Sequence, residues 1–415
     1  MFSVLAKPTG AACNLACTYC FFLSKNQILG DDERVSERMM ELHLRRYLEA
    51  QPDDDVTVAW QGGEPMMRGY GFFAHAFACA ERLARPGQCI HHVLQTNGTL
   101  IDDRWAELFS RHYVLVGVSM DGPAELHDVY RVNYAGRGSH NAVVAGWRAL
   151  ERHDVQRNVL CAVHAVNEGH PLEVYRYFRD ELGAEHMQFI PIVERVHRRQ
   201  LEIAENGWRK TDGRRLLYRQ EGHAVTSRSV SAKGWGRFLN TVFDEWVSRD
   251  VGRRFVQLFD VMLGNIFGMH SLCVHSPKCG NALVLTHDGD VYCCDHFVEP
   301  GYRLGDIMRL GYKALVDSPV NLRFSRLKSS LPSDCLDCPV RWACHGGCPK
   351  DRLAEDGDGG HILNYLCSGY KAFFSHALPA MSVMAELVDR GEPAARVMEM
   401  RWGTRSGCVE EGEHV

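Results

Sequence analysis

Short runs of apolar residues alternate with longer amphipathic stretches along the first 195 residues of the chain. Short, continuous apolar runs are typical of parallel strands that helices cover on both faces. These runs predict six strands, at residues 2–7, 56–61, 90–96, 114–119, 157–164 and 186–191. The stretches between them predict five helices, at residues 34–50, 69–85, 101–111, 139–153 and 170–182.

The last of these helices shows the amphipathic pattern clearly. Its apolar positions fall three, three and four residues apart, on one helix face, at Leu172, Tyr175, Phe178 and Leu182. Six alternations of strand and helix predict a parallel α/β domain. Six units are too few to close an eight-fold barrel, so we expect a partial barrel or an open sheet. In either fold, ligand-binding residues lie at the carboxyl ends of the strands.

The pattern changes beyond the last predicted strand. Residues 195–233 hold ten Arg or Lys against four Asp or Glu, with little periodicity, which predicts an exposed and irregular connection. A solvated charged loop is the simplest interpretation, and a docking surface for an acidic or peptide partner is the alternative. We further predict a helix from the N-cap Ser231 to about Arg249, a closing helix at 368–392 and a disordered tail from residue 402.

The composition is that of an ordinary globular protein. The 415 residues are 45% hydrophobic and 24% charged, and 47 basic against 52 acidic residues give a net charge of −5. This balance provides no global basic field for nucleic acid. The sequence has no run of about 18 apolar residues to span a bilayer, and its first ten residues lack the pattern of a secretory signal. We expect a cytoplasmic protein that binds neither nucleic acid nor a membrane.

Sixteen cysteines are many for such a protein, and in a reducing compartment we expect metal ligands rather than disulfides. A first group, Cys13, Cys17 and Cys20, follows the first predicted strand. A structural zinc site needs four ligands, and no fourth Cys or His lies nearby in the sequence. Four-iron clusters are usually held by four thiolates, so three thiolates leave one iron open to bind and activate a ligand.

Two more cysteine groups lie in the C-terminal half. They are Cys273, Cys279, Cys293 and Cys294, and then Cys335, Cys338, Cys344, Cys348 and Cys367. Residues 335–348 could form a zinc knuckle with four cysteines, but this would leave four of the other cysteines without partners. For the isolated cysteines we expect packing or surface roles; these are Cys79, Cys89, Cys161 and Cys408.

Polar motifs follow the next three predicted strands. They read Gln61-Gly62-Gly63-Glu64-Pro65, Gln95-Thr96-Asn97-Gly98 and Ser119-Met120-Asp121-Gly122. The CxxxCxxC loop followed by these motifs resembles the radical S-adenosylmethionine (SAM) superfamily. The resemblance implies that Gly62, Gly63 and Glu64 meet the amino group of SAM. It further implies that Tyr19 lies beside the adenine of SAM, that Ser119 contacts its ribose and that Arg131 binds its carboxylate. A guanidinium can hold a carboxylate in bidentate fashion.

The later cysteines resemble the SPASM extension of radical SAM enzymes, which binds two auxiliary iron–sulfur clusters. By this resemblance one auxiliary cluster is held by Cys273, Cys279, Cys294 and Cys348, and the other by Cys335, Cys338, Cys344 and Cys367. Cys293 is then spare. The implied cofactors are SAM and three [4Fe–4S] clusters, one that binds SAM and two auxiliary ones.

The implied fold is a partial (β/α)6 TIM-like barrel followed by a cysteine-rich SPASM domain. The barrel is expected at residues 1–195 and the SPASM domain at 271–375. Residues 196–270 are expected to connect them with the basic loop and a helix. A C-terminal helix and a flexible tail are expected at 376–415.

Stretches across residues 4–375, among them KPTGAACNLACTYCFF and GDVYCCDHFVEPGYRLGDI, resemble the anaerobic sulfatase-maturating enzymes. The resemblance implies that a 5′-deoxyadenosyl radical abstracts hydrogen from the β-carbon of an active-site Cys or Ser of a sulfatase. Loss of a proton and an electron then leads to Cα-formylglycine. The implied partners are an unfolded or nascent sulfatase polypeptide and an electron donor such as flavodoxin or ferredoxin, and a monomer is expected.

The same resemblance implies Asp295, next to Cys294, as the general base, and we expect burial to raise its pKa toward neutrality. Two alternatives stay open: Asp295 only hydrogen-bonds the cluster loop, or His296 is the base. Gln61 is expected to contact the substrate backbone. Phe22 is also expected at the substrate, but it stands where a family member has Tyr, so the hydroxyl contact of that residue is missing.

Two other functions are compatible with these patterns. One is a SPASM enzyme that forms a crosslink or an epimer in another peptide. The other is a non-catalytic electron carrier or zinc protein. An aldehyde product on a sulfatase-type peptide distinguishes a sulfatase-maturating enzyme from the first alternative. Iron and sulfide analysis tests the second.

Overall fold

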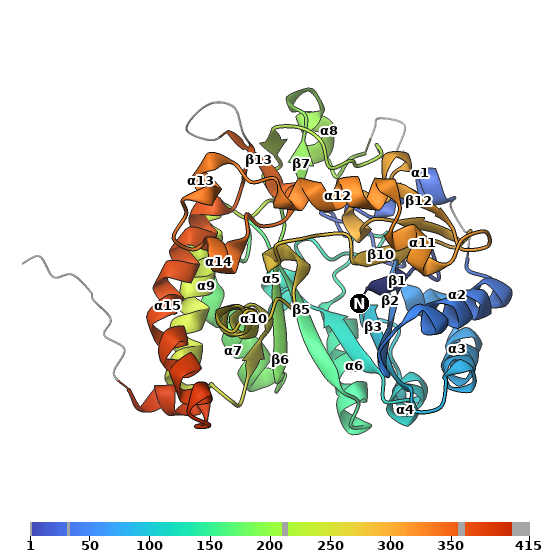
Figure 1. The fold of residues 1–415 in the computed structure, drawn as a ribbon, viewed down its shortest axis with the longest axis horizontal. Coiled ribbons are helices and arrows are strands. Elements are labelled where there is room, and N and C mark those ends of the chain that lie inside the picture. The colour runs from blue at the N-terminus through green and yellow to red at the C-terminus, as the bar shows by residue number, and fades with distance from the viewer. Residues whose placement is uncertain (1, 31–33, 210–214, 356–361, 401–415) are drawn as a thin grey trace, which may run out of the picture.

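The predicted strands form the middle of one large sheet in the computed structural model, which describes residues 2–30, 34–209, 215–355 and 362–400 (Figure 1). They are β1 (Ser3–Ala6), β2 (Asp55–Trp60), β3 (Cys89–Thr96), β4 (Leu115–Ser119), β5 (Arg157–Val163) and β6 (His186–Pro191). All five neighbouring pairs among them are parallel. The parallel α/β expectation is therefore confirmed, and the carboxyl ends of the strands share one edge.

The sheet is longer than predicted, because later parts of the chain extend both edges. Its order is β12-β11-β10-β1-β2-β3-β4-β5-β6-β9. The added strands are β9 (Phe255–Val256), β10 (Ala282–Leu285), β11 (Asp290–Tyr292) and β12 (Arg303–Asp306). Strand β10 pairs in parallel with β1, and β11 and β12 follow in antiparallel fashion. The cysteine-rich segment therefore continues the sheet and brings the residues after β11 against the end of β1.

The predicted helices between the strands surround the sheet (Figure 1). They are α2 (Glu37–Ala50), α3 (Tyr70–Leu83), α4 (Asp103–Arg111), α6 (His140–Arg152) and α7 (Pro171–Arg176). Helix α7 continues as a π-helical turn at Tyr177–Glu181, so the predicted helix at 170–182 is present but widens in its last turn. Among the described residues, no helix is both long and apolar enough to cross a membrane.

Two longer helices pack together beside β6. They are α9 (Ala232–Arg249), with the predicted N-cap at Ser231, and the closing helix α15 (Cys367–Asp389). A Cβ atom on Gly369 would lie 2.2 Å from the carbonyl oxygen of Ala232, and one on Gly236 would lie 2.9 Å from Gly369 Cα. Only glycine fits at both positions, so this pair of glycines sets the close contact between the two helices.

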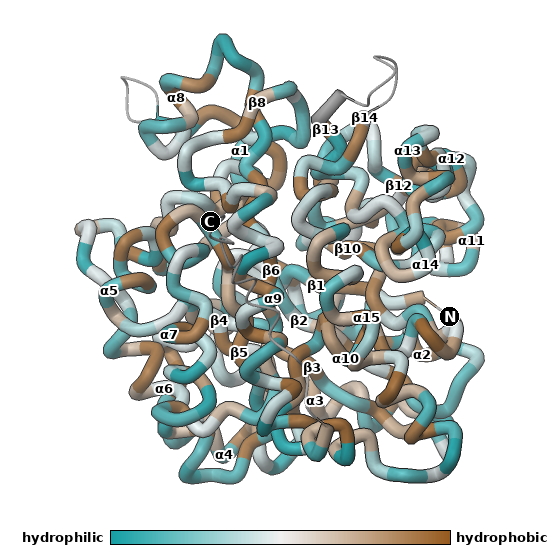
Figure 2. The backbone as a smooth tube through the Cα atoms, turned by 90° about the vertical axis from the view of Figure 1, so that its left-hand side faces the viewer, coloured by the Kyte–Doolittle hydropathy of each residue, from teal (hydrophilic) through white to brown (hydrophobic). Residues whose placement is uncertain are grey.

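The basic stretch at 195–233 is more ordered than predicted in its described part. It contains β7 (Arg195–Val196), α8 (Leu201–Glu205) and β8 (Ala224–Val225). It encloses a small core of its own, formed by Val196, Ala204, Trp208 and Tyr218. These apolar residues are too widely spaced to give a periodic signal. The segment stands at the top of the molecule, where polar positions surround its few apolar ones (Figure 2). Residues 210–214 and the predicted tail lie outside the described residues.

Candidate active site

The loop after β1 presents the first three cysteines in a buried setting. Burial raises the pKa of the Cys13 thiol to about 12 and that of Cys17 to about 11. The negative charge of Cys20 raises both pKa values further, as expected for three thiols on one short loop. Thiols with such pKa values stay protonated unless a metal takes the place of the protons. The donor set therefore fits a metal cluster and is inert without one.

The segment after β2 packs directly on this loop. The Gly63 amide donates to the Gly10 carbonyl at 3.0 Å, and the Glu64 amide donates to the Ala12 carbonyl at 2.8 Å. A Cβ atom on Gly63 would lie 2.0 Å from the Ala12 oxygen, so only glycine permits this approach. Gly62 lies beside Gly10 in the same contact. The predicted glycines thus hold the cysteine loop through its backbone.

Glu64 is a buried carboxyl group with no cation partner among the described residues. Its side chain is 0% exposed and accepts hydrogen bonds from Thr96 Oγ1 at 2.8 Å and from the Asn97 amide at 2.7 Å. Burial raises its pKa to about 7, although these hydrogen bonds oppose the rise. A bound ammonium would supply the missing positive charge and stabilise the carboxylate. Glu64 therefore fits the amino group of SAM that the resemblance implies.

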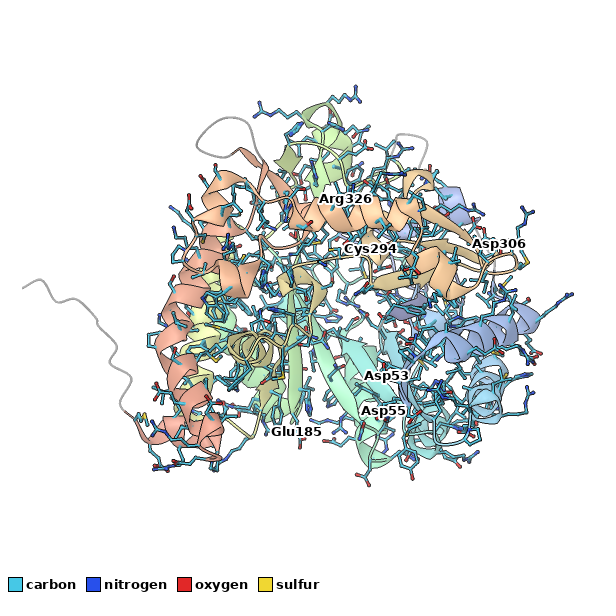
Figure 3. The ribbon with its side chains drawn as sticks, in the orientation of Figure 1. Asp53, Asp55, Glu185, Cys294, Asp306 and Arg326 are labelled. Carbon is cyan, nitrogen blue, oxygen red and sulfur yellow. The ribbon has the colours of Figure 1, made fainter. Side chains whose placement is uncertain are left out.

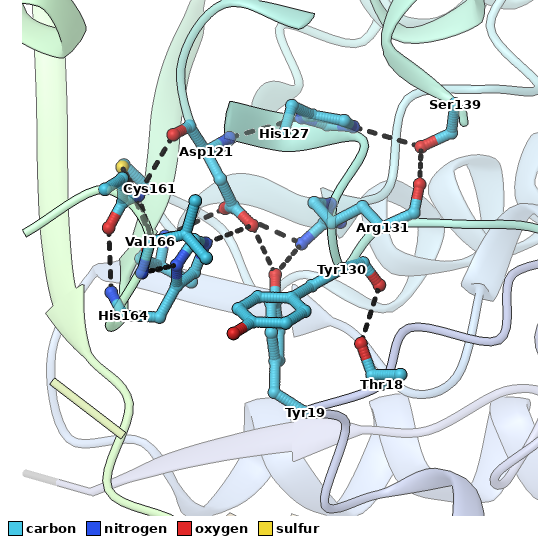
Figure 4. Close-up of polar contacts among 12 residues, drawn as sticks. Thr18, Tyr19, Asp121, His127, Tyr130, Arg131, Ser139, Cys161, His164 and Val166 are labelled. Atoms are coloured by element: carbon cyan, nitrogen blue, oxygen red, sulfur yellow. Dashed lines mark hydrogen bonds and ion pairs between the residues drawn. The ribbon is translucent and has the colours of Figure 1, made fainter. Parts of the chain in front are cut away.

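Asp121 organises the residues expected around the adenine and the carboxylate of SAM (Figure 4). Tyr19 donates its hydroxyl to Asp121 Oδ2 at 2.6 Å, and Arg131 Nη1 donates to the Tyr19 hydroxyl at 2.8 Å. Burial alone would raise the pKa of Asp121, but Arg131 and His164 hold it well below its usual range. Asp121 is thus a buried carboxylate that fixes both Tyr19 and Arg131. Sequence analysis quoted it within a motif but gave it no role.

Arg131 keeps one donor free for a ligand. Its guanidinium lies 3.9 Å from Asp121, and its Nε atom is buried without a hydrogen-bond partner. A buried donor without a partner is costly, and a ligand carboxylate would satisfy it. Ser119 lies at the end of β4, half-buried, on the same edge of the sheet. These positions fit the carboxylate and ribose of SAM.

A buried lysine at the end of β1 meets the predicted base. Lys7 is 1% exposed, and its Nζ lies 2.5 Å from Asp295 Oδ1. The same Nζ donates to Gln61 Oε1 at 2.9 Å, and Gln61 Nε2 donates to Gln95 Oε1 at 3.1 Å. Lys7 was not among the site residues predicted from the sequence. Its place directly after a strand, on the edge that supplies the other site residues, was the signal that could have found it.

The pKa expected for Asp295 was wrong in direction. Burial raises it, but the charge of Lys7, together with His296 and a hydrogen bond from Gln61, lowers it below its ordinary value. Asp295 is therefore a carboxylate at neutral pH that can accept a proton. Burial lowers the pKa of His296 to about 3, so this imidazole is neutral and a poor proton acceptor. The electrostatics favour Asp295 over His296 as the base.

Phe22 is turned toward the protein interior. It is 4% exposed and belongs to a small apolar cluster with Val284, Tyr292 and Val298. Lys7 Nζ lies 4.0 Å from the centre of its ring, a distance at which a cation and an aromatic face attract each other. The ring therefore supports the Lys7 ammonium and leaves little surface for a substrate.

The eight later cysteines separate into two neighbourhoods. Cys335, Cys338, Cys344 and Cys367 line one cavity. In the other neighbourhood, the charges of Cys348 and Cys273 raise the pKa of Cys294 beyond the effect of burial. The charge of Cys273 also raises the pKa of Cys279. Cys293 is fully buried and stands in neither group. These neighbourhoods are compatible with the two sets of four that the SPASM resemblance implies, and the assignment of each cysteine to a cluster stays a prediction.

Among the described residues, the three cysteine groups do not show the close ligand spacing of a preformed zinc site. Zn–S bonds of about 2.3 Å in a tetrahedron place neighbouring sulfurs about 3.8 Å apart. Across the described ranges, the groups with three ligand atoms within 4.8 Å of one another are Glu41–His75–Cys79 and Asp55–Cys89–His91. Neither includes a cysteine of the three groups, and Asp55 lies at the opposite end of the sheet from Cys294 (Figure 3).

The basic segment is attached to the far side of the first cysteine loop. Lys25 donates to the Tyr218 carbonyl at 2.9 Å and pairs with Glu299 at 3.0 Å. The Tyr218 amide donates to Ser24 Oγ at 2.9 Å. A buried ion pair between Arg228 and Glu194 holds the base of the segment. The segment therefore covers the loop beyond Cys20 rather than extending freely into solvent.

Comparison with known proteins gives two family matches and several similar whole chains. Residues 8–178 match the Radical SAM superfamily, and residues 273–339 match SPASM, an iron–sulfur cluster-binding domain. The chain is 40% identical to a serine-type anaerobic sulfatase-maturating enzyme of Bacteroides thetaiotaomicron, over 97% of this chain and 95% of the relative. It is 31% identical to a cysteine-type enzyme of the same description from Clostridium perfringens, over 91% and 97%.

A solved structure agrees with these matches. Native anSMEcpe with bound AdoMet and Cp18Cys peptide superposes with a TM-score of 0.80 at 30% identity. The similarity covers 93% of this chain and 99% of that one. Both the sheet with its loops and the cysteine-rich extension are therefore shared with a protein that binds SAM and a peptide.

Proposed function

The chain belongs to the anaerobic sulfatase-maturating enzymes of the radical SAM family, and on this basis we propose that Asp295 and Lys7 complete its oxidation of a sulfatase Cys or Ser to Cα-formylglycine. The observation that carries the proposal is the buried Lys7–Asp295 pair at the end of β1. It provides an ionised carboxylate on the edge of the sheet where the SAM-type residues lie. Serine-type and cysteine-type relatives both match, so we propose both side chains as targets.

The residues at the ends of β1 to β4 would hold the cofactors. Cys13, Cys17 and Cys20 would bind a cluster with one open iron, Glu64 would bind the amino group of SAM and Arg131 its carboxylate. When bound and reduced there, SAM supplies a 5′-deoxyadenosyl radical that removes a hydrogen atom from the substrate β-carbon. Tyr19 and Asp121 keep the Arg131 guanidinium in place.

Asp295 would take the proton that must leave the substrate. After loss of the hydrogen atom, the hydroxyl or thiol would give its proton to a carboxylate oxygen of Asp295, and the carbon radical would give one electron to a nearby acceptor, which leaves C=O or C=S. Water would then hydrolyse C=S to C=O and release hydrogen sulfide. Lys7 and Gln61 orient the carboxylate and keep it deprotonated until then. Because Lys7 contacts Asp295, the proton transferred from the substrate stays within this group of charged side chains.

The two sets of four cysteines would hold two auxiliary clusters, which gives three [4Fe–4S] clusters and about twelve irons per chain. The auxiliary clusters would accept the substrate electron. We further propose the residue ranges given above for the barrel, the connecting segment, the SPASM domain and the C-terminal helix. A monomeric cytoplasmic protein that acts on an unfolded sulfatase and receives electrons from a flavodoxin or a ferredoxin fits this arrangement.

One experiment tests the proposed function directly. Peptides with the motif Cys-x-Pro-x-Arg or Ser-x-Pro-x-Arg are incubated anaerobically with the reconstituted enzyme, SAM and a reductant. Mass spectrometry should find an aldehyde on the target residue and no crosslink. A crosslinked or epimerised product, or no product on several such peptides while SAM is cleaved, would assign the chain to another modification.

A further inference from the structure

Two cations, Lys328, which is buried, and Arg352, which is half-buried, lie beside the loops that carry the two sets of four cysteines. Lys328, near the end of helix α12 (Pro319–Ser329), is 0% exposed. Its Nζ donates to the Val274 carbonyl at 2.7 Å and also to the Gly347 carbonyl. Val274 is adjacent in sequence to Cys273, and Gly347 is adjacent to Cys348. The ammonium is therefore held against two of the loops that carry cysteines.

The second cation is joined to the same helix end. Arg352, the first residue of β13 (Arg352–Glu355), donates to the Leu327 carbonyl at 2.6 Å, to the Ser330 carbonyl at 2.8 Å and to the Lys328 carbonyl at 2.8 Å. These bonds fix the guanidinium beside the C-terminal turn of α12. The helix end thus places two positive charges close to each other, which is unfavourable unless negative charge lies nearby.

Each cation faces cysteines of both sets. Burial raises the thiol pKa values, and the charge of Lys328 opposes this effect at Cys273, Cys279 and Cys344. The charge of Arg352 opposes it at Cys279 and at Cys335. One set contains Cys273 and Cys279, and the other contains Cys335 and Cys344. The geometry agrees, because the Gly347 carbonyl accepts from Lys328 while the Gly347 amide donates to the Cys344 carbonyl at 3.0 Å, so the cations lie close to both sets.

Neither cation pairs with a carboxylate in the part of the chain that the structure describes. Lys350, which is also close to Cys348 and Cys294, is different, because Asp351 lies 2.5 Å from its Nζ. A buried charge without a counter-charge is costly. Four thiolates outweigh the positive charge of an oxidised four-iron core, so a ligated cluster is anionic, and reduction adds one negative charge. Clusters at both sites would supply the missing counter-charge.

We propose that Lys328 and Arg352 form a cationic bridge between the two auxiliary clusters and raise the reduction potentials of both. This inference rests on the proposed function for the source of the electron. The substrate carbon radical is oxidised by one electron, its proton goes to Asp295, and one auxiliary cluster is reduced by that electron. A positive charge stabilises the reduced cluster more than the oxidised one, so the bridge makes the clusters better electron acceptors and favours transfer between them.

The test is an anaerobic redox titration followed by EPR on the full chain in which Cys13, Cys17 and Cys20 are all changed to Ala. Only the auxiliary clusters then contribute signals, and no peptide is needed. Lys328→Met and Arg352→Gln should each lower the midpoint potentials by about 59 mV or more, a tenfold change in a one-electron equilibrium. Arg352→Lys keeps the charge and should stay close to the parent. Lys313→Met, at an exposed position, should have no effect.

Iron content decides between electrostatic and merely structural roles. Full iron with unchanged potentials in Lys328→Met and Arg352→Gln would overturn the proposal, as would equal shifts in Arg352→Gln and Arg352→Lys. If Lys328→Met loses iron because two carbonyls lose their hydrogen-bond donor, the comparison of Arg352→Gln with Arg352→Lys alone tests the electrostatic role. A failure to form formylglycine in the wild-type enzyme would contradict the proposed function and leave these potentials unaffected.

Discussion

Charged side chains have different partners at the carboxyl ends of the central strands and in the cysteine-rich region beside helix α12. At the ends of β1 and β4, anions and cations of the protein pair with each other: Lys7 with Asp295, and Arg131 with Asp121. In the cysteine-rich half, Lys350 pairs with Asp351, whereas Lys328 and Arg352 have no carboxylate partner within the described ranges. Glu64 is the one exception in the first region, since it is a carboxyl group without a described cation partner.

Paired buried charges hold neighbouring residues in place, whereas unpaired ones need a cofactor of opposite charge. A paired buried charge has its electrostatic needs met and can hold a neighbour in place, as Asp121 holds Tyr19. An unpaired buried charge is unstable until a group of opposite charge arrives. Glu64 then marks the place of a cation, and Lys328 and Arg352 mark the place of anions. The sign of each unpaired charge agrees with an ammonium in one region and with thiolate-bound clusters in the other.

The largest effect should come from removing the first cysteine group. Changing Cys13, Cys17 and Cys20 together to Ala should abolish SAM cleavage and remove about four irons of about twelve, because the open-site cluster is lost. Release of 5′-deoxyadenosine and iron analysis measure both effects. Loss of all iron would mean that the two regions do not assemble independently.

The second-largest effect is expected for Lys7→Met, which breaks the Lys7–Asp295 pair. Without its cation, Asp295 is left as a buried carboxylate that takes up a proton more readily, so less of it is available as a base. Formylglycine formation should fall at least about a hundredfold, while 5′-deoxyadenosine is still released. Asp295→Asn should give the same separation of the two activities. Product formation at the wild-type rate in Lys7→Met would remove Lys7 from the site.

Asp121→Asn should have a smaller effect, on cofactor binding. The amide cannot balance the charge of Arg131, and a hydrogen bond to a charged group contributes about 1.5–3 kcal/mol, so the Kd for SAM should rise about tenfold or more. Equilibrium dialysis with SAM measures this. Tyr19→Phe removes one hydroxyl but keeps the ion pair and should weaken binding less. If Tyr19→Phe is the more damaging change, the organising role belongs to the tyrosine.

Much of this arrangement could be predicted from the sequence. Continuous apolar runs marked the six central strands, since a strand covered on both faces has no polar side. The motifs after those strands then pointed to one edge of the sheet. Cysteine spacing separated the reactive loop from the later groups. Each of these signals is local, and each depends on residues close together in the chain.

The features that were missed depend on contacts between distant segments. Strand β10 pairs with β1 across most of the chain length, and only this pairing brings Asp295 to Lys7. The lowered pKa of Asp295 follows from that contact, so an argument from burial alone gave the wrong direction. Trp208 and Tyr218 similarly build a small core that has no periodic signal. Lys328 and Arg352 became visible only once both cysteine sets were placed.

The smallest expected effect is on stability. It comes from a buried histidine that stays neutral in the folded protein. Burial lowers the pKa of His43 to about 3, and its Nδ1 lies 2.8 Å from the Tyr312 hydroxyl. Between pH 6.5 and 3 the unfolded chain binds a proton that the folded chain does not, so stability falls as pH falls, by up to about 1.4 kcal/mol per pH unit.

Urea unfolding of the holoenzyme at pH 7 and pH 5 checks this effect. His43→Gln should lose less stability than the wild type between the two pH values, because glutamine does not titrate. Cluster damage at low pH affects both proteins, and the difference between them isolates His43. Equal losses would show that this histidine does not titrate differently on folding.

The most direct measurement is the ratio of formylglycine to 5′-deoxyadenosine formed on a sulfatase peptide, in the wild type and in Asp295→Asn, under the same anaerobic conditions. The wild type should form formylglycine in proportion to the cleaved SAM. In Asp295→Asn, 5′-deoxyadenosine should persist and the ratio should fall at least about a hundredfold. An unchanged ratio would contradict the role of the Lys7–Asp295 pair, and no formylglycine from the wild type would contradict the proposed function itself.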